Sequence, residues 1–142
     1  MVLEGHVGRI CFSRLSEGED LAEAIRTRVK ESGIRAGVFF LIGSLKTVSL
    51  GYYKEGEYKS TRLNGPLEIA SCTGNIAVDE KDDPVIHPHI VVANERGEAF
   101  GGHLMKDSLV GVTAELVIVE ATGIRLKRVF DEKTRLNLWK LS

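Results

Sequence analysis

A single helical segment followed by a long succession of β-type segments is the feature that most limits how this chain can fold. From residue 34 onward the sequence reads as strand after strand, beginning with the β-branched and aromatic run 37–53. Gly43 predicts a bulge or bend within that run, and residues 55–57 and 64–66 have the composition of turns. Short connections between such segments favour antiparallel pairing, so we expect a mostly antiparallel sheet of seven or eight strands.

The segment 16–33 has a different period. Its apolar residues recur every four positions, at Leu21, Ile25 and Val29. Asp20 and Glu23 have the spacing of a capping box, and Gly33 stands where a helix-ending glycine is expected. One main helix combined with an antiparallel sheet predicts an α+β fold.

The length and composition fit one globular domain. We expect residues 1–142 to form a single domain with one core. Apolar residues make up 43% and charged residues 27% of the chain, which places it among ordinary globular proteins. No apolar run approaches the roughly 20 residues of a membrane span, and the N-terminus does not read as a signal peptide. We therefore expect a cytoplasmic protein.

The charge distribution opposes a role that depends on phosphate contacts. The net charge is −1, whereas nucleic-acid-binding proteins normally carry a basic excess or a basic face. The most basic stretch, 125–135, is interrupted by Asp131 and Glu132 and is interpreted as a solvated strand and turn. Cys11 and Cys72 each lie in an apolar segment, and we expect free, buried thiols.

Three of the four histidines, His87, His89 and His103, fall close together in the sequence. Residues i and i+2 of a strand point to the same face, so the first two emerge together. The segment 94–97 predicts a type I turn that ends in a left-handed glycine. If this turn closes a hairpin, His89 falls directly opposite His103, and His87 lies diagonally across from it.

The same register has consequences for the reverse face of the hairpin. It gathers four apolar side chains there, Ile90, Val92, Phe100 and Leu104. A slip of one residue would move His103 to that face, so the apolar set supports the register independently. Gly101 and Gly102 lack side chains, which predicts room for a ligand close to the backbone.

Three neutral imidazoles from one hairpin would form an open metal site, with a further coordination position free. We therefore predict that His87, His89 and His103 are metal ligands. Zinc is the first choice, while iron(II), nickel, copper and manganese stay open because histidine suits several metals. The alternatives are unrelated strand histidines or a purely structural metal with four ligands. His6 is expected to be exposed and separate.

Two carboxylates stand inside otherwise apolar strands, Glu68 and Glu115, and each needs a partner if it is buried. A two-residue turn at 106–107 would pair the strands on either side of it and direct Glu115 away from His103. We interpret both carboxylates as structural, with Arg9 as an arginine that could pair with them. No catalytic acid or base is assigned.

Four segments carry a family resemblance: GEDL at 18–21, IGSL at 42–45, GPLEIASCTGNI at 65–76 and IHPHIVVANERGEAFGGHLMKDSLVGVTAELVI at 86–118. Together they resemble the plants-and-prokaryotes-conserved (PPC) domain, from about residue 7 to residue 130. The resemblance implies a single α+β domain that assembles as a homotrimer. It also implies a stand-alone prokaryotic member, and those members have no assigned activity.

The plant relatives carry an AT-hook before the domain and act on A·T-rich DNA. This chain begins within a few residues of its first expected strand, so we expect no AT-hook and no nucleic-acid partner. The resulting prediction is a trimeric metal-binding protein with a small-molecule ligand at the metal. Whether it is an enzyme stays open. The alternative is a non-enzymatic oligomerisation or DNA-associated module.

The expected fold is also similar to that of acetolactate decarboxylase, a metalloenzyme whose zinc is held by three histidines. This likeness supports a metal at His87, His89 and His103. It implies no particular reaction, because one fold hosts many functions.

Overall fold

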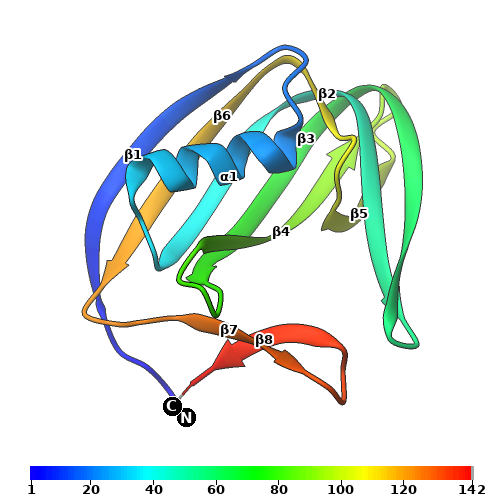
Figure 1. Ribbon diagram of the computed structural model, residues 1–142. Helices are drawn as coiled ribbons and strands as arrows, with labels where there is room; N and C mark the ends of the chain where they lie inside the picture. Colours follow the sequence, from blue (N-terminus) through cyan, green and yellow to red (C-terminus); the bar gives the residue numbers. More distant parts are fainter. Residues whose placement is uncertain (142) are drawn as a thin grey trace.

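Within residues 1–141, the part of the chain that this computed structural model describes, eight strands form one sheet and a single helix lies across one face of it (Figure 1). In chain order the elements are β1 (His6–Ser16), α1 (Leu21–Ser32), β2 (Gly37–Lys54), β3 (Glu57–Val78), β4 (Pro84–Ala93), β5 (Ala99–Leu104), β6 (Leu109–Thr122), β7 (Lys127–Asp131) and β8 (Leu136–Lys140). The predicted α+β fold with a mostly antiparallel sheet is confirmed.

The order of the strands in the sheet is β1–β6–β2–β5–β4–β3–β7–β8, and β2 also pairs with β3. The pairings are antiparallel except for one parallel contact between β3 and β7. Because β5 and β4 connect β2 to β3 while β2 and β3 also pair directly, these four strands close a ring. The histidine segment belongs to this ring.

Helix α1 begins and ends at the residues that the sequence predicts. The Asp20 carboxylate accepts a hydrogen bond from the Glu23 amide at 3.0 Å, and Gly33 ends the helix in the left-handed conformation with φ 71°. The Glu23 carboxylate accepts from Arg26 at 2.6 Å, so the capping box is formed only in part. No helix within residues 1–141 is long and apolar enough to cross a membrane.

The core lies between α1 and the sheet. The helix contributes fully buried side chains at each predicted apolar position, Leu21, Ile25 and Val29. They belong to one cluster with buried side chains of the strands, which include Leu15, Phe39, Leu45, Leu116 and Ile118. Burying such side chains supplies about 1.5–3 kcal/mol each, which offsets the entropy lost on folding.

The predicted hairpin around residues 106–107 is wrong. Strands β5 and β6 do not pair with each other within the described chain; both pair with β2 instead. The backbone groups beside the turn have other partners: the Met105 amide donates to the Ser49 carbonyl, and the Asp107 amide donates to the Asp20 carboxylate. Glu115 lies opposite the exposed Ile42 on β2.

Two further predictions concern breaks within strands. Residues 64–66 are not a turn but part of β3, where the register with β2 shifts between Leu45 and Thr47. A pair of strands can accommodate an extra residue as a bulge, and the chain then continues in the same direction. A glycine next to a proline is compatible with such a bulge as well as with a turn. The bend predicted at Gly43 is confirmed, because the register shifts there and Gly43 has φ 148°.

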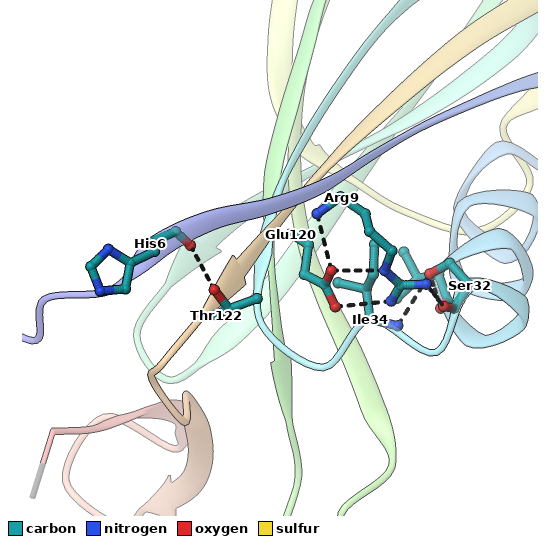
Figure 2. Close-up of polar contacts among 7 residues, drawn as sticks. His6, Arg9, Ser32, Ile34, Glu120 and Thr122 are labelled. Atoms are coloured by element: carbon teal, nitrogen blue, oxygen red, sulfur yellow. Dashed lines mark hydrogen bonds and ion pairs between the residues drawn. The ribbon is translucent and has the colours of Figure 1, made fainter.

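Arg9 pairs with Glu120 rather than with Glu68 or Glu115, so that prediction is corrected (Figure 2). Its Nε donates to Glu120 Oε2 at 2.8 Å and its Nη2 to Oε1 at 2.9 Å. Its Nη1 donates to the Ser32 carbonyl at 3.1 Å. One guanidinium therefore joins β1, β6 and the C-terminal end of α1 through charge-assisted hydrogen bonds.

Candidate metal site

The β4–β5 hairpin has the predicted turn and register. The Asn94 amide donates to the Glu98 carbonyl at 3.1 Å, and Gly97 is left-handed with φ 75°. His89 is directly opposite His103 on the neighbouring strand. The predicted turn therefore accounts for which side chains meet, because the length of a hairpin loop fixes its register.

The reverse face of this hairpin follows the prediction in part. Ile90, Val92 and Leu104 are buried in the core, which holds the histidines on the opposite face. Phe100 lies opposite Val92, as the predicted register requires. It is 40% exposed, so it is the one member of the apolar set that is not buried.

The three imidazoles come together on one side of the hairpin. Ring centroids are 5.0 Å apart for His87 and His89, 5.1 Å for His87 and His103, and 5.5 Å for His89 and His103. Each ring offers one nitrogen, and these three nitrogens lie within 4.8 Å of one another. His89 is exposed while the other two are half-buried, so the cluster opens to solvent on one side.

The electrostatics of the cluster favour neutral rings at His87 and His103. Burial lowers the pKa of His103 to about 4, with further lowering by His87, His89 and Arg128. Burial also lowers the pKa of His87, followed by the charges of Arg128 and His89. A neutral imidazole keeps one nitrogen lone pair available, which is the form that binds metals.

One atom of the cluster is left without a partner. His103 Nδ1 is buried and has no hydrogen bond to any residue within 1–141. An unsatisfied buried polar atom costs about 1–3 kcal/mol, and coordination to a metal is one way of satisfying an imidazole nitrogen. The donor set of three imidazoles and this unpartnered nitrogen both fit a divalent transition metal.

Tyr58 and Gly51 support His103 from the β2–β3 hairpin. The Tyr58 ring lies 4.9 Å from the His103 ring, centroid to centroid. Gly51 is directly opposite His103, and a Cβ there would come within 2.8 Å of Met105 Sδ and 3.1 Å of Tyr58 Cδ1. The absence of a side chain at Gly51 therefore allows the tyrosine to pack against the histidine.

Glycines 101 and 102 do not have the predicted role. A Cβ at Gly102 would lie 2.8 Å from the Gly51 carbonyl oxygen, and a Cβ at Gly101 would lie 3.1 Å from the Ile90 carbonyl oxygen. The space that their missing side chains provide is filled by the backbones of β2 and β4. These glycines allow close strand packing rather than ligand binding.

The sequence did not identify Arg128, which lies beside the cluster. Its Nη2 is 3.2 Å from His87 Nδ1 and donates to Asn75 Oδ1 at 2.9 Å. Residues 125–135 are interpreted from the sequence as a strand and turn, and β7 does form a hairpin with β8. The side chain is nevertheless half-buried, because the parallel contact between Val78 and Lys127 holds β7 against β3. No local pattern in the sequence signals that contact.

The other titratable groups considered from the sequence lie outside this cluster. His6 is exposed, as expected. Both cysteines are free, although Cys11 is only half-buried. Burial raises the pKa of the Cys72 thiol to about 12, so this cysteine is unreactive at neutral pH.

The sequence matches the Plants and Prokaryotes Conserved (PCC) domain over residues 2–122. The chain belongs to this family. Among curated proteins, the bifunctional protein GlmU of a Synechococcus strain is 31% identical over 123 residues, which cover 85% of this chain and 18% of that protein. The chain thus spans less than a fifth of the length of the curated relatives it matches.

Two solved structures of the PCC fold are also similar to this chain. One is a metal-containing protein of Archaeoglobus fulgidus, 34% identical, with a TM-score of 0.88 and 99% of both chains covered. The other is a plant- and prokaryote-conserved protein of Pyrococcus horikoshii, also 34% identical, with a TM-score of 0.88 and coverage of 99% of this chain and 97% of that one. The eight-stranded sheet with one helix is therefore a PCC-domain fold.

Proposed function

We propose that this PCC domain binds one divalent transition metal through His87, His89 and His103, and that a small molecule binds at the metal. Zinc is the first choice. The observation that carries the proposal is the convergence of three imidazoles on one open side of the β4–β5 hairpin. When bound there, such a metal supplies Lewis acidity.

Two features support an open site rather than a closed structural one. Structural zinc sites normally have four protein ligands, whereas the cluster within residues 1–141 has three. A cavity of about 500 Å³ adjoins the cluster and is lined in part by His87, His103 and Tyr58. This volume is in the range of small-molecule sites. The similar Archaeoglobus protein is described as metal-containing, which adds support for a metal.

We also propose that the chain assembles as a homotrimer. Large apolar side chains on the neighbouring strands β1, β6 and β2 are exposed in the single chain: Val7, Ile10, Phe12, Val38, Phe40, Ile42 and Val112. Phe12 and Phe40 both lie opposite Val117, so they form a row across the three strands. A continuous apolar surface of this kind is typical of a protein–protein interface.

Calorimetric titration of chelator-treated protein with zinc sulfate tests the proposed metal site. We expect uptake of about one zinc per chain, and loss of that uptake in His103→Ala, because two imidazoles do not hold zinc as three do. His6→Ala is the matched control, since it removes a histidine that lies outside the cluster. Wild-type protein that binds no zinc, cobalt or nickel would remove the basis of the proposal.

A further inference from the structure

The Arg128 guanidinium is held in place at the edge of the histidine cluster. Its Nη1 donates to the Asn137 carbonyl at 2.7 Å, and its Nη2 donates to Asn75 Oδ1 at 2.9 Å. The Trp139 ring lies against it, with 5.6 Å between Cζ and the ring centroid. Three residues of strands β3 and β8 therefore position this cation, and its Nε is buried without a hydrogen-bond partner within residues 1–141.

The hydrogen bond between Arg128 and His87 must break when His87 binds a metal. A guanidinium can only donate, so His87 Nδ1 must be the acceptor in the 3.2 Å contact, and the proton of the neutral ring is then on Nε2. A metal at Nδ1 would take the same lone pair. A metal at Nε2 would leave the proton on Nδ1, so that two donors would face each other. In either case, binding of the metal by His87 frees an N–H of Arg128.

The freed donor would lie in a cavity whose lining carries charges of both signs. Arg128, Arg26 and Lys81 line it together with two acidic residues, Asp79 and Glu80, and Arg26 is already paired with Glu23. The Asp79 carboxylate already accepts from the Lys81 and Asp83 amides, at 2.8 and 3.0 Å. Addition of a divalent cation would make the positive charge of the cavity larger, so an anionic ligand is favoured over a neutral or cationic one.

We propose that Arg128 is the anion-binding residue of this site, which holds the carboxylate of a small organic acid beside the metal. The inference rests on the proposed metal site and goes beyond it by naming the class of ligand. A planar guanidinium matches a carboxylate in shape. Of the two arginines that line the cavity, Arg128 is the one that contacts a histidine of the cluster.

Cobalt(II) bound in place of zinc allows the inference to be tested without an activity assay. Chelator-treated wild type, Arg128→Met, Arg128→Lys and Arg125→Met are each loaded with cobalt, and the visible absorption bands are followed while sodium propionate is added. Arg125→Met is the matched control, since it removes a guanidinium that pairs with Asp82 and does not line the cavity. Inorganic phosphate is titrated in a parallel series.

We expect propionate to bind the wild type at least about tenfold more tightly than Arg128→Met, because the variant loses a hydrogen bond between charged groups; tenfold corresponds to about 1.4 kcal/mol. Arg128→Lys should be intermediate and Arg125→Met close to the wild type. Without any anion, Arg128→Met should bind cobalt more tightly than the wild type, since no hydrogen bond competes for His87. This second readout requires only a folded protein.

The possible failures are distinguishable. If wild-type protein takes up no cobalt, zinc or nickel, the proposed metal site is wrong and the inference falls with it. If cobalt binds but wild type and Arg128→Met have equal affinities for propionate, only the role of Arg128 is overturned. Tighter, Arg128-dependent binding of phosphate than of propionate would overturn the assignment of a carboxylate ligand.

Discussion

The Asp20 carboxylate joins the start of helix α1 to Asp107, in the turn after the strand that carries His103. One oxygen accepts from the Glu23 amide at 3.0 Å, and the other accepts from the Asp107 amide at 2.7 Å. The residue that caps the helix thus also fixes the exit of β5. The Asp20 side chain therefore couples the N-terminal end of helix α1 to the turn that follows β5.

Removal of this carboxylate should destabilise the protein, and replacement by an amide should destabilise it less. Asp20→Ala loses both acceptors, and we expect a loss of about 1–2 kcal/mol in the free energy of unfolding, the usual cost of deleting a helix N-cap. Asp20→Asn keeps one carbonyl oxygen and should fall between alanine and the wild type. Urea denaturation at neutral pH measures the series. Equal stability of Asp20→Ala and the wild type would show that neither hydrogen bond matters.

The ion pair between Arg9 and Glu120 predicts how stability depends on acid. Hydrogen bonds from Arg9 lower the pKa of Glu120 from 4.5 to about 2. A carboxyl whose pKa is lower in the folded state stabilises the protein fully above its unfolded pKa, and this contribution disappears as the pH falls through its folded pKa. The stability gap between wild type and Glu120→Gln should therefore be constant above about pH 4.5 and close between pH 4.5 and pH 2.

Urea unfolding of the two proteins at a series of pH values measures this gap. Glu31→Gln, which removes the same charge from an exposed position on α1, is the control. A gap between wild type and Glu120→Gln that is independent of pH from 2 to 6 would contradict the stabilising role of the pair.

The exposed row on β1, β6 and β2 predicts the assembly state. Sedimentation equilibrium of the wild type should give three times the 15.6 kDa chain mass. Phe40→Glu places a charge in the apolar row and should shift the protein to a smaller species, because an unpaired charge is costly to bury. Phe130→Glu, at an exposed position on β7, should leave the mass unchanged. A wild type with the mass of one chain would refute the proposed trimer.

The sequence was most informative where structure depends on neighbouring residues. The helix ends follow from Asp20 and Gly33, whose side-chain acceptor and left-handed backbone act within one turn of the helix. The meeting of His89 and His103 follows from a short loop whose length fixes the register. Local rules of this kind apply whatever the rest of the chain does.

Partners distant in sequence could not be predicted in the same way. Strands β5 and β6 are adjacent along the chain, yet each pairs with β2, a choice that depends on the whole sheet. Arg128 reaches His87 only because β7 lies beside the end of β3. In the sequence Arg128 belongs to a basic stretch that is expected to be solvated. Nothing in the local sequence distinguishes it from Arg125 or Lys127.

The most direct test of the metal site is elemental analysis of protein purified without a histidine tag, beside His89→Ala/His103→Ala and His6→Ala. The wild type and His6→Ala should contain about one divalent metal per chain, zinc if the first choice is correct, and the double variant should contain none. Circular dichroism should show that all three proteins are folded. Metal at the same level in the folded double variant, or none in the wild type even after incubation with zinc, would contradict a metal site at these histidines.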